Sequence, residues 1–332
     1  MKIIFNRRKF RGLIQVLLLF TFHFSLLTLL SSCSKEKISL SFTELHSGIT
    51  DDLNDVLFLN DSVGYICGGL RYEQGDILKT SDGGFTWQNQ STNEMIKALY
   101  HVTFISSDTG FTCGYDGKIF RTFDGGNSWE YFQNYYSPIR SLFMLNSGEG
   151  FACGGVGFDH GYKLQTTNYG DAWRWDTSKV EYRDIVFFNT SSGVMCGYGE
   201  ILFTNDGGAT WNYSNAKQDF FVAMSFVNSE TGYAIGYTGS IWRTDDGGEN
   251  WTRLRNSNTL FQTNWYLNCV AFRDENTGYV AGEKGLFLKT TDGGNHWGKV
   301  DNAPDVNWKG ISLVSNGGVI CGTDGKIYRF LD

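Results

Sequence analysis

Arginine and carboxylate side chains in the longer turns are the residues of this chain that could do chemistry together. Arg71, Arg140 and Arg183 could clamp a carboxylate group, and Glu73 or Asp159 could act as an acid, as hydrolysis of an acidic glycoside requires. Their spacing selects none of them for that role, and no F-R-I-P-like segment lies near the N-terminus. A sialidase-like glycoside hydrolase is therefore a minority hypothesis, and we predict no catalytic residues.

Cysteine and histidine, the other reactive or metal-binding residue types, predict no site. Five of the six cysteines after Cys33 share one place in a repeated segment, where two other copies have Ile235 and Ala281; they are Cys67, Cys113, Cys153, Cys196 and Cys321. A place that accepts Cys, Ile and Ala is small and buried, so we expect free thiols. The scattered histidines lack metal-ligand spacing, and the Asp-Gly-Gly segments lack the clustered acids of a Ca²⁺ site. We expect no metal and no cofactor.

The elements that must position these residues repeat along the chain. The segment Thr80 to Trp87 has the pattern T-x-D-G-G-x-x-W, and five further copies follow at spacings of 42, 44, 38, 40 and 46 residues. The Asp or Asn and the Trp of the six copies are Asp82 and Trp87, Asp124 and Trp129, Asn168 and Trp173, Asp206 and Trp211, Asp246 and Trp251, and Asp292 and Trp297. A quasi-period of this length predicts a propeller, a solenoid or an array.

Each copy is typical of a tight hairpin. The Asp side chain can accept hydrogen bonds from its own turn, and Gly supplies a positive φ. In the third copy Tyr169 replaces the first Gly and Gly170 keeps the second. We therefore expect only the second position to need the left-handed conformation.

Short apolar runs separated by turn signals predict four antiparallel strands in each repeat unit. The units begin near Leu53, Leu99, Ile139, Tyr182, Phe221, Leu267 and Trp308, and the seventh ends before its fourth strand. The segment Phe42 to Ser47 matches that missing strand, because Phe42 stands where Trp stands elsewhere. The sequence therefore predicts an all-β fold: a single seven-bladed β-propeller of four-stranded antiparallel blades, residues 38–332, closed by the N-terminal strand.

The N-terminus is typical of an exported lipoprotein. A basic start, an apolar run and Leu30-Ser31-Ser32-Cys33 predict a signal peptide over residues 1–32, lipid on Cys33 and a short tether over residues 33–37. An uncleaved membrane anchor is the alternative. The net charge of the full chain is −7, and removing residues 1–32 takes away five basic side chains and leaves −12. An acidic chain without a Lys/Arg cluster is not expected to bind nucleic acid.

The hairpin motif resembles the Asp-box, or BNR repeat, of sialidases and related propellers. The longer pattern, F-x-x-x-x-x-G-[YF]-x-x-G ahead of G-x-I-x-[KR]-T-x-D-G-G-x-x-W, is closer to the YCF48-like photosystem II stability and assembly factors and covers nearly all of Leu53 to Phe330. This resemblance implies a non-catalytic factor that holds a membrane-protein intermediate. With its lipobox, the chain also looks like the propeller lipoproteins of Bacteroidetes-type bacteria.

The resemblance also implies that the binding face lies opposite the hairpins, on the second-to-third turns and the connections between blades. Aromatic, arginine and acidic residues there are candidate binding residues, or alternatively fill the funnel: Arg71, Tyr72, Glu73, Tyr136, Arg140, Phe158, Asp159, His160, Arg183, Trp265 and Tyr266. A second set of basic residues precedes the repeat Thr and could ring an anion, although pairing with carboxylates or Trp faces is the better expectation: Lys79, Arg121, Arg243, Lys289 and Arg329.

These observations favour a lipid-anchored interaction or assembly module of the cell envelope, held at the outer membrane through Cys33, with other envelope proteins as partners. A glycan-binding lipoprotein is the second hypothesis. It would need an aromatic platform at Tyr136, Trp265 or Tyr266.

Overall fold

The computed structural model describes residues 38–133, 136–258 and 264–332, and these residues form strands joined by turns. Residues 38–332 make one compact unit, separate from residues 1–37. The predicted signal peptide, the tether and Cys33 all lie outside the described residues. No helix in the described part of the chain is long and apolar enough to cross a membrane.

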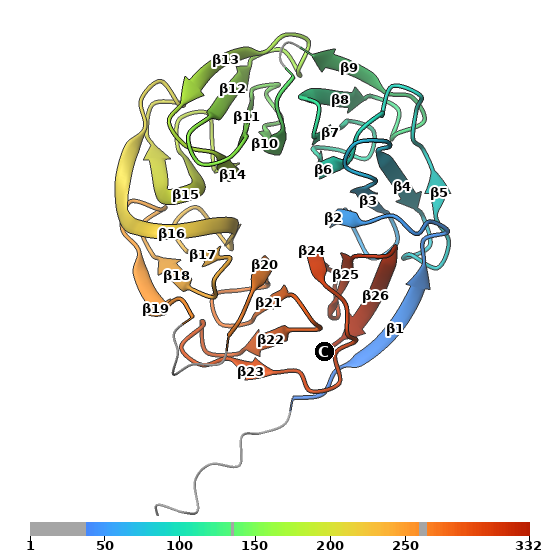
Figure 1. Cartoon of the computed structure of the whole chain (residues 1–332), viewed down its shortest axis with the longest axis vertical. Coiled ribbons are helices and arrows are strands. Elements are labelled where there is room, and N and C mark those ends of the chain that lie inside the picture. The colour runs from blue at the N-terminus through green and yellow to red at the C-terminus, as the bar shows by residue number, and fades with distance from the viewer. Residues whose placement is uncertain (1–37, 134–135, 259–263) are drawn as a thin grey trace, which may run out of the picture. The chain divides into compact units, whose positions relative to one another are not determined.

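The strands form sheets arranged in a ring (Figure 1), and the inner strands line two connected cavities at its centre, which we call the channel. In each sheet the first strand lies at the channel and the last lies at the outer edge. The first three sheets are β2 (Leu53–Phe58), β3 (Gly64–Gly68), β4 (Asp76–Thr80) and β5 (Gln88–Asn89); β6 (Leu99–Phe104), β7 (Gly110–Gly114), β8 (Lys118–Thr122) and β9 (Glu130–Gln133); and β10 (Ile139–Met144), β11 (Gly150–Gly155), β12 (Gly161–Thr166) and β13 (Arg174–Ser178).

Two further four-stranded sheets complete the ring after a six-stranded one. The six-stranded sheet holds β14 (Tyr182–Phe187), β15 (Gly193–Thr204), β16 (Asn212–Phe226), β17 (Gly232–Gly236), β18 (Ile241–Thr244) and β19 (Thr252–Arg255). The next sheet is β20 (Leu267–Phe272), β21 (Gly278–Gly282), β22 (Phe287–Thr290) and β23 (Gly298–Lys299), and the last is β24 (Trp308–Leu313), β25 (Gly318–Gly322), β26 (Lys326–Leu331) and β1 (Ser41–His46).

The prediction of seven four-stranded blades is therefore wrong: the described chain forms six blades, and one of them contains both the fourth and the fifth repeat units. Strand β16 runs from the outer edge to the channel (Figure 1) and pairs with β15 and then with β17. The physical reason lies in its sequence. No Gly or Pro interrupts residues 212–226, so the connection between the two units keeps its pairing with β15, although the register shifts and Gln218 adopts a left-handed φ of 65° within it.

The N-terminal strand closes the ring. Strand β1 pairs antiparallel with β26, from Ser41 opposite Leu331 to His46 opposite Lys326, and so completes the last sheet. The inner strands contact one another all round the channel, including β2 against β24. No sheet edge is left open between the first and the last repeat unit, which protects the ring from pairing with other chains.

All six Asp-Gly-Gly hairpins use the same hydrogen bonds. The hydroxyl of the repeat Thr accepts the N–H of the second Gly position at 2.8–3.1 Å. The Asp or Asn side chain accepts the N–H four residues later at 2.8–3.1 Å. The expectation that only the second position is left-handed is wrong, because the first position also has a positive φ and Tyr169 adopts it at 55°. The common hydrogen bonds hold that conformation even without Gly.

Three of the basic residues before the repeat Thr join their blade to a neighbouring hairpin. Lys79 donates to the carbonyl of Gly125 at 2.8 Å, Arg121 to that of Tyr169 at 3.3 Å, and Arg329 to that of Gly83 at 3.1 Å. Arg121, Arg243 and Lys289 also pair with carboxylates, as expected. These side chains hold neighbouring blades together instead of ringing an anion.

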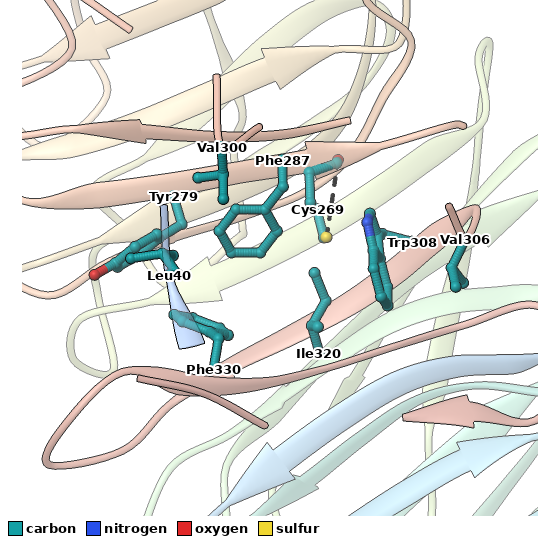
Figure 2. Packing of buried hydrophobic residues seen from close by; sticks show 10 residues of the cluster. Leu40, Cys269, Tyr279, Phe287, Val300, Val306, Trp308, Ile320 and Phe330 are labelled. Carbon is teal, nitrogen blue, oxygen red and sulfur yellow. Dashed lines mark hydrogen bonds between the residues drawn. The ribbon is translucent and has the colours of Figure 1, made fainter. Parts of the chain in front are cut away.

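The cores lie between neighbouring sheets. Figure 2 shows one of them, where Phe287 of β22, Trp308 of β24 and Phe330 of β26 pack together with Leu40. On most blades the hairpin Trp packs edge-on against the Phe that ends the inner strand, with ring centroids 5.9–6.3 Å apart. The six cysteines after Cys33 are buried and free, which confirms that prediction.

Candidate functional site: the channel mouth

A β-bulge shapes the start of every inner strand in the described chain. The register shifts between the first and third residues of β2, β6, β10, β14, β20 and β24, for example between Leu53 and Asp55, and in the same way within β16 between Phe221 and Ala223, where that strand reaches the channel. A bulge re-aims side chains and marks functional edges in many sheets. The seven second residues all line one cavity of about 660 Å³ at the end of the channel opposite the hairpins: Asn54, Tyr100, Arg140, Arg183, Val222, Asn268 and Lys309.

Two arginines at this mouth share one carboxylate. The Nε of Arg140 lies 2.9 Å and the NH1 of Arg183 lies 2.8 Å from the same Glu181 oxygen, Oε1. The Glu181 side chain is only 9% exposed. Burial, and then the positive charge of Arg183, lower the pKa of Arg140. One buried anion therefore compensates two cations, so the pair can accept a further negative group from a ligand.

Aromatic rings extend this pair on both sides. The guanidinium of Arg140 lies 4.6 Å from the ring centroid of Tyr100, and that of Arg183 lies 5.3 Å from the Phe220 ring. Further rings continue at centroid distances of 4.3–6.4 Å, through Tyr115 and Tyr72 on one side and through Tyr198, Phe158, Tyr237 and Tyr266 on the other. We call these residues, together with Arg140 and Arg183, the mouth belt. Such a surface of aromatic and arginine side chains is what binding interfaces favour.

The channel beneath the mouth carries titratable groups. Asp55, His101 and Asp184 line both the mouth cavity and a deeper one of about 250 Å³. Enclosure within the ring raises the pKa of both aspartates. Each accepts an N–H from the neighbouring inner strand, Asp55 from Val102 at 3.0 Å and Asp184 from Met224 at 2.8 Å, so both have a structural role.

The predicted binding residues lie at this end of the ring but do not all meet. Arg140 and Arg183 line the mouth cavity, and Tyr72, Phe158 and Tyr266 belong to the mouth belt. Arg71 stacks over Tyr115, so the three arginines of the hydrolase hypothesis do not converge on one point of the described cavity. The remaining predicted residues are dispersed: Glu73 lies exposed in its turn, Tyr136 is 85% exposed, Asp159 pairs with His160 at the surface, and Trp265 lies under the Arg255 guanidinium.

Sequence reasoning missed half of the mouth belt. Tyr115, Tyr198 and Tyr237 occupy one repeat position, directly after a Gly, as the pairs Gly114-Tyr115, Gly197-Tyr198 and Gly236-Tyr237 show; Gly114 and Gly236 end their strands, whereas Gly197 lies within β15. Tyr100 holds the bulge position of β6, and Phe220 lies within β16, directly before the bulge that begins at Phe221. The recurrence of aromatic residues at these repeat positions is visible in the sequence and could have identified them as candidates. Glu181, before β14, had none.

Fold and site together define a β-propeller whose channel mouth is lined by aromatic, basic and acidic side chains. A sequence-family profile described as Photosynthesis system II assembly factor YCF48 matches residues 34–132, 165–263 and 215–329, well over half of the chain. The chain therefore belongs to this family. Membership of this family and the propeller fold support a non-catalytic assembly or stability module.

Individual relatives agree with this placement. Photosystem II assembly lipoprotein Ycf48 of Synechococcus sp. (strain CC9902) is 32% identical over 76 residues, a match that takes in 21% of this chain and only 23% of that protein. The solved structure of YCF48 bound to D1 peptide has a TM-score of 0.70 at 19% identity, over 90% of this chain and 100% of that one. Virginiamycin B lyase from Staphylococcus aureus, an enzyme, has the same TM-score of 0.70 at 10% identity, over 89% and 100%. At such identities the likeness shows the fold and not the activity.

Proposed function

We propose that this chain is a non-catalytic propeller that holds a polypeptide segment of an envelope protein at the mouth belt while that protein is assembled. The observation that carries the proposal is the continuity of the belt, in which rings and guanidinium groups follow one another around the cavity. A relative whose structure contains a bound peptide supports a polypeptide as the ligand. Exposed Tyr72 and Phe158, at 59% and 64%, offer apolar surface on which such a segment can dock.

We further propose that the chain is a bacterial lipoprotein, anchored to the outer membrane through lipid on Cys33, with outer-membrane or other envelope proteins as clients. The Leu-Ser-Ser-Cys segment and Ser34 support the anchor and its destination. A Cys33→Ser variant should move from the membrane fraction to the soluble fraction or stay as an unprocessed precursor. Mass spectrometry of the processed N-terminus tests the lipid directly, and an unmodified Cys33 in a membrane-bound chain would contradict it.

Photo-crosslinking tests the choice of face. A photoreactive phenylalanine analogue at Tyr72 or Phe158 should capture a discrete client protein in intact cells. The matched controls are Phe85 and Phe123, which lie on the hairpins at the opposite ends of their blades and are similarly exposed, at 68% and 51%. Equal capture from both faces, or capture from the hairpin face alone, would contradict the proposal.

A triple variant, Arg71→Ala with Arg140→Ala and Arg183→Ala, tests the two arginines of the mouth belt together with Arg71, which stacks over Tyr115 of the belt. Crosslinking from native membranes should lose the client that the wild-type chain captures. Because Glu181 loses both of its partners, the variant should also be less stable, so capture is compared at a temperature at which its unfolding curve shows it to be folded. A client captured equally by the triple variant would show that these arginines do not contribute to binding.

A further inference from the structure

A buried carboxylate without a cation lies at the start of β4. Asp76 is 0% exposed. Its Oδ1 accepts a hydrogen bond from the Gln74 amide at 2.8 Å, but its Oδ2 has no hydrogen-bond partner among the described residues. The half-buried Asp51 lies close by in the chain, because the carbonyl of the next residue, Asp52, accepts the N–H of Gly69 at 2.8 Å, and Gly68 pairs with Asp76 across β3 and β4. The negative charge of Asp51 adds to the effect of burial in raising the pKa of Asp76. Because ionised carboxylates carry no donor, the pair needs a positive charge from elsewhere.

The next repeat unit shows how the same place is normally satisfied. Lys118 begins β8 as Asp76 begins β4, and it is also buried, at 5% exposure. Its Nζ lies 2.6 Å from the carbonyl oxygen and 3.4 Å from the carboxylate of Glu94, and 3.9 Å from the carboxylate of Asp116. Asp116 holds the turn position that Gln74 holds in the first unit. In the second unit the carboxylates of Glu94 and Asp116 surround the ammonium group of Lys118. In the first unit Asp76 replaces that lysine, so the side chains there are those of Asp51, Gln74 and Asp76, which all carry oxygen atoms.

We propose that a calcium ion binds between the carboxylates of Asp51 and Asp76. Ca²⁺ takes carboxylate, amide and water oxygens in flexible geometry, which suits one buried and one half-open carboxylate. No group of three or more acidic, imidazole or thiol side chains in the described chain is arranged to hold a metal. Water therefore completes the coordination from the open side of Asp51, and two charged ligands place the affinity at about 0.1–1 mM, as in extracellular calcium modules.

The ion would brace the closure of the ring and one edge of the mouth. The carbonyl of Asp51 accepts the N–H of Gly325 from the last repeat unit at 2.9 Å, and the carbonyl of Asp52 accepts that of Gly69 at 2.8 Å. Residues 69–75 carry Arg71 and Tyr72. Calcium would thus tie the segment after β1 to the turn that presents part of the mouth belt, and this inference does not depend on the proposed function.

Calorimetry and thermal unfolding of the full chain test the site. Titration of CaCl₂ into the chelator-treated protein at pH 7.5 should show one site, and 10 mM Ca²⁺ should raise the Tm by roughly 3 °C. Asp76→Asn and Asp51→Asn should each abolish both the heat and the shift. Asp116→Asn is the matched control, because its unit already contains Lys118, and it should keep the full calcium response.

Three results would overturn the proposal. They are no calcium response in the wild-type chain, an unchanged response in Asp51→Asn or Asp76→Asn, and loss of the response in Asp116→Asn alone. Burial, reinforced by the negative charge of Asp51, raises the pKa of Asp76, so a shared proton is the competing occupant. With a shared proton, the Tm of the wild-type chain measured in chelator would fall as the pH rises, and the Tm of Asp76→Asn would not depend on pH. Calcium would then leave the Tm of the wild-type chain unchanged.

Discussion

Two clusters of three charges, one on each face of the ring, are built in opposite ways. On the hairpin side the NH2 of Arg121 lies 3.0 Å from carboxylate oxygens of both Glu130 and Asp171, which are 70% and 67% exposed. At the mouth the carboxylate of Glu181 is 9% exposed and holds two arginines. The first cluster is a solvated contact between blades that recurs with variations around the ring. The second occurs at one place among the described residues, is buried, and pairs two guanidinium groups with one carboxylate.

The difference indicates that the hairpins contribute mainly to the stability of this propeller, whereas the mouth contributes to the recognition of a ligand. Each hairpin satisfies its own backbone, and six hairpins share the task, so the loss of one is local. Some rings of the mouth belt occupy repeat positions, but the cluster of Arg140, Arg183 and Glu181 is found at one place among the described residues. A change there should alter binding together with stability, because Glu181 positions the arginines that would meet the client.

The largest expected effect is that of Glu181→Gln. Removing the buried carboxylate leaves two close guanidinium groups without a compensating charge, so the free energy of unfolding should fall by about 3 kcal/mol. This value is at the low end for buried ion pairs, because both arginines are partly exposed. Client crosslinking from Tyr72 and Phe158 should fall as well. Urea unfolding measures the first effect.

Glu130→Gln is the matched control on the opposite face. It removes one of two exposed carboxylates from Arg121, and exposed pairs contribute about 0–1 kcal/mol, so its unfolding curve should nearly coincide with that of the wild-type chain. If both variants lost the same stability, the contrast between the two clusters would be wrong.

Thr122→Val should have the next largest effect. The hydroxyl of Thr122 accepts the N–H groups of Gly126 at 2.8 Å and Asp124 at 3.3 Å, and valine keeps its shape but not its acceptor. Leaving buried N–H groups without a partner costs about 2 kcal/mol. Thr122→Ser keeps the oxygen and should restore most of the loss. Client crosslinking at the mouth should survive in both variants, and its disappearance would show that the two faces are coupled.

The sequence predicted the hairpin face in far more detail than the mouth, and the reason is physical. A hairpin is a local structure whose hydrogen bonds join residues within about four positions, so T-x-D-G-G-x-x-W specifies it almost completely. The prediction failed at Tyr169, because a shared set of hydrogen bonds can impose a left-handed conformation on a residue other than Gly. It failed again at β16, where the absence of a breaker let two predicted blades become one sheet.

The mouth depends on contacts between residues far apart in the chain. Arg140 and Glu181 are 41 residues apart, and no spacing in the sequence pairs them. The candidates Arg140, Arg183, Phe158 and Tyr266 were found because loops of the expected binding face carried them. The aromatic residues that connect them occupy repeat positions. From the sequence, an aromatic residue at such a position could pack in the core or line the mouth, and only the bulge shows which way its side chain points.

A smaller effect is expected from Asp124→Asn, and it should depend on pH. Hydrogen bonds from the Ser128 hydroxyl, the Ser128 N–H and the Thr122 hydroxyl lower the pKa of Asp124 from 3.8 to about 2. A lowered folded pKa contributes stability that is present above about 3.8 and is lost as the pH falls toward 2. The difference in unfolding free energy between Asp124→Asn and the wild-type chain, measured in urea, should therefore shrink between pH 4 and pH 2. In the third hairpin Asn168 provides the control, since Asn168→Ala should open a gap that stays constant over this range.

The smallest effect is expected from Tyr169→Gly, which tests whether the hairpin is set by backbone needs alone. Glycine relieves a left-handed φ of 55°, worth about 1 kcal/mol, and so should stabilise the turn. It also removes the hydrogen bond from the Tyr169 hydroxyl to the carbonyl of Asn146 at 2.9 Å, worth a similar amount, and adds freedom to the unfolded chain. The net change in unfolding free energy should lie within about 0.5 kcal/mol of zero.

Tyr169→Phe separates the two contributions, because it keeps the strain and loses only the hydrogen bond, and should be the less stable variant. If Tyr169→Gly were clearly less stable than Tyr169→Phe, the tyrosine ring itself would be part of the hairpin's packing, and the third copy would differ from the others in more than its backbone.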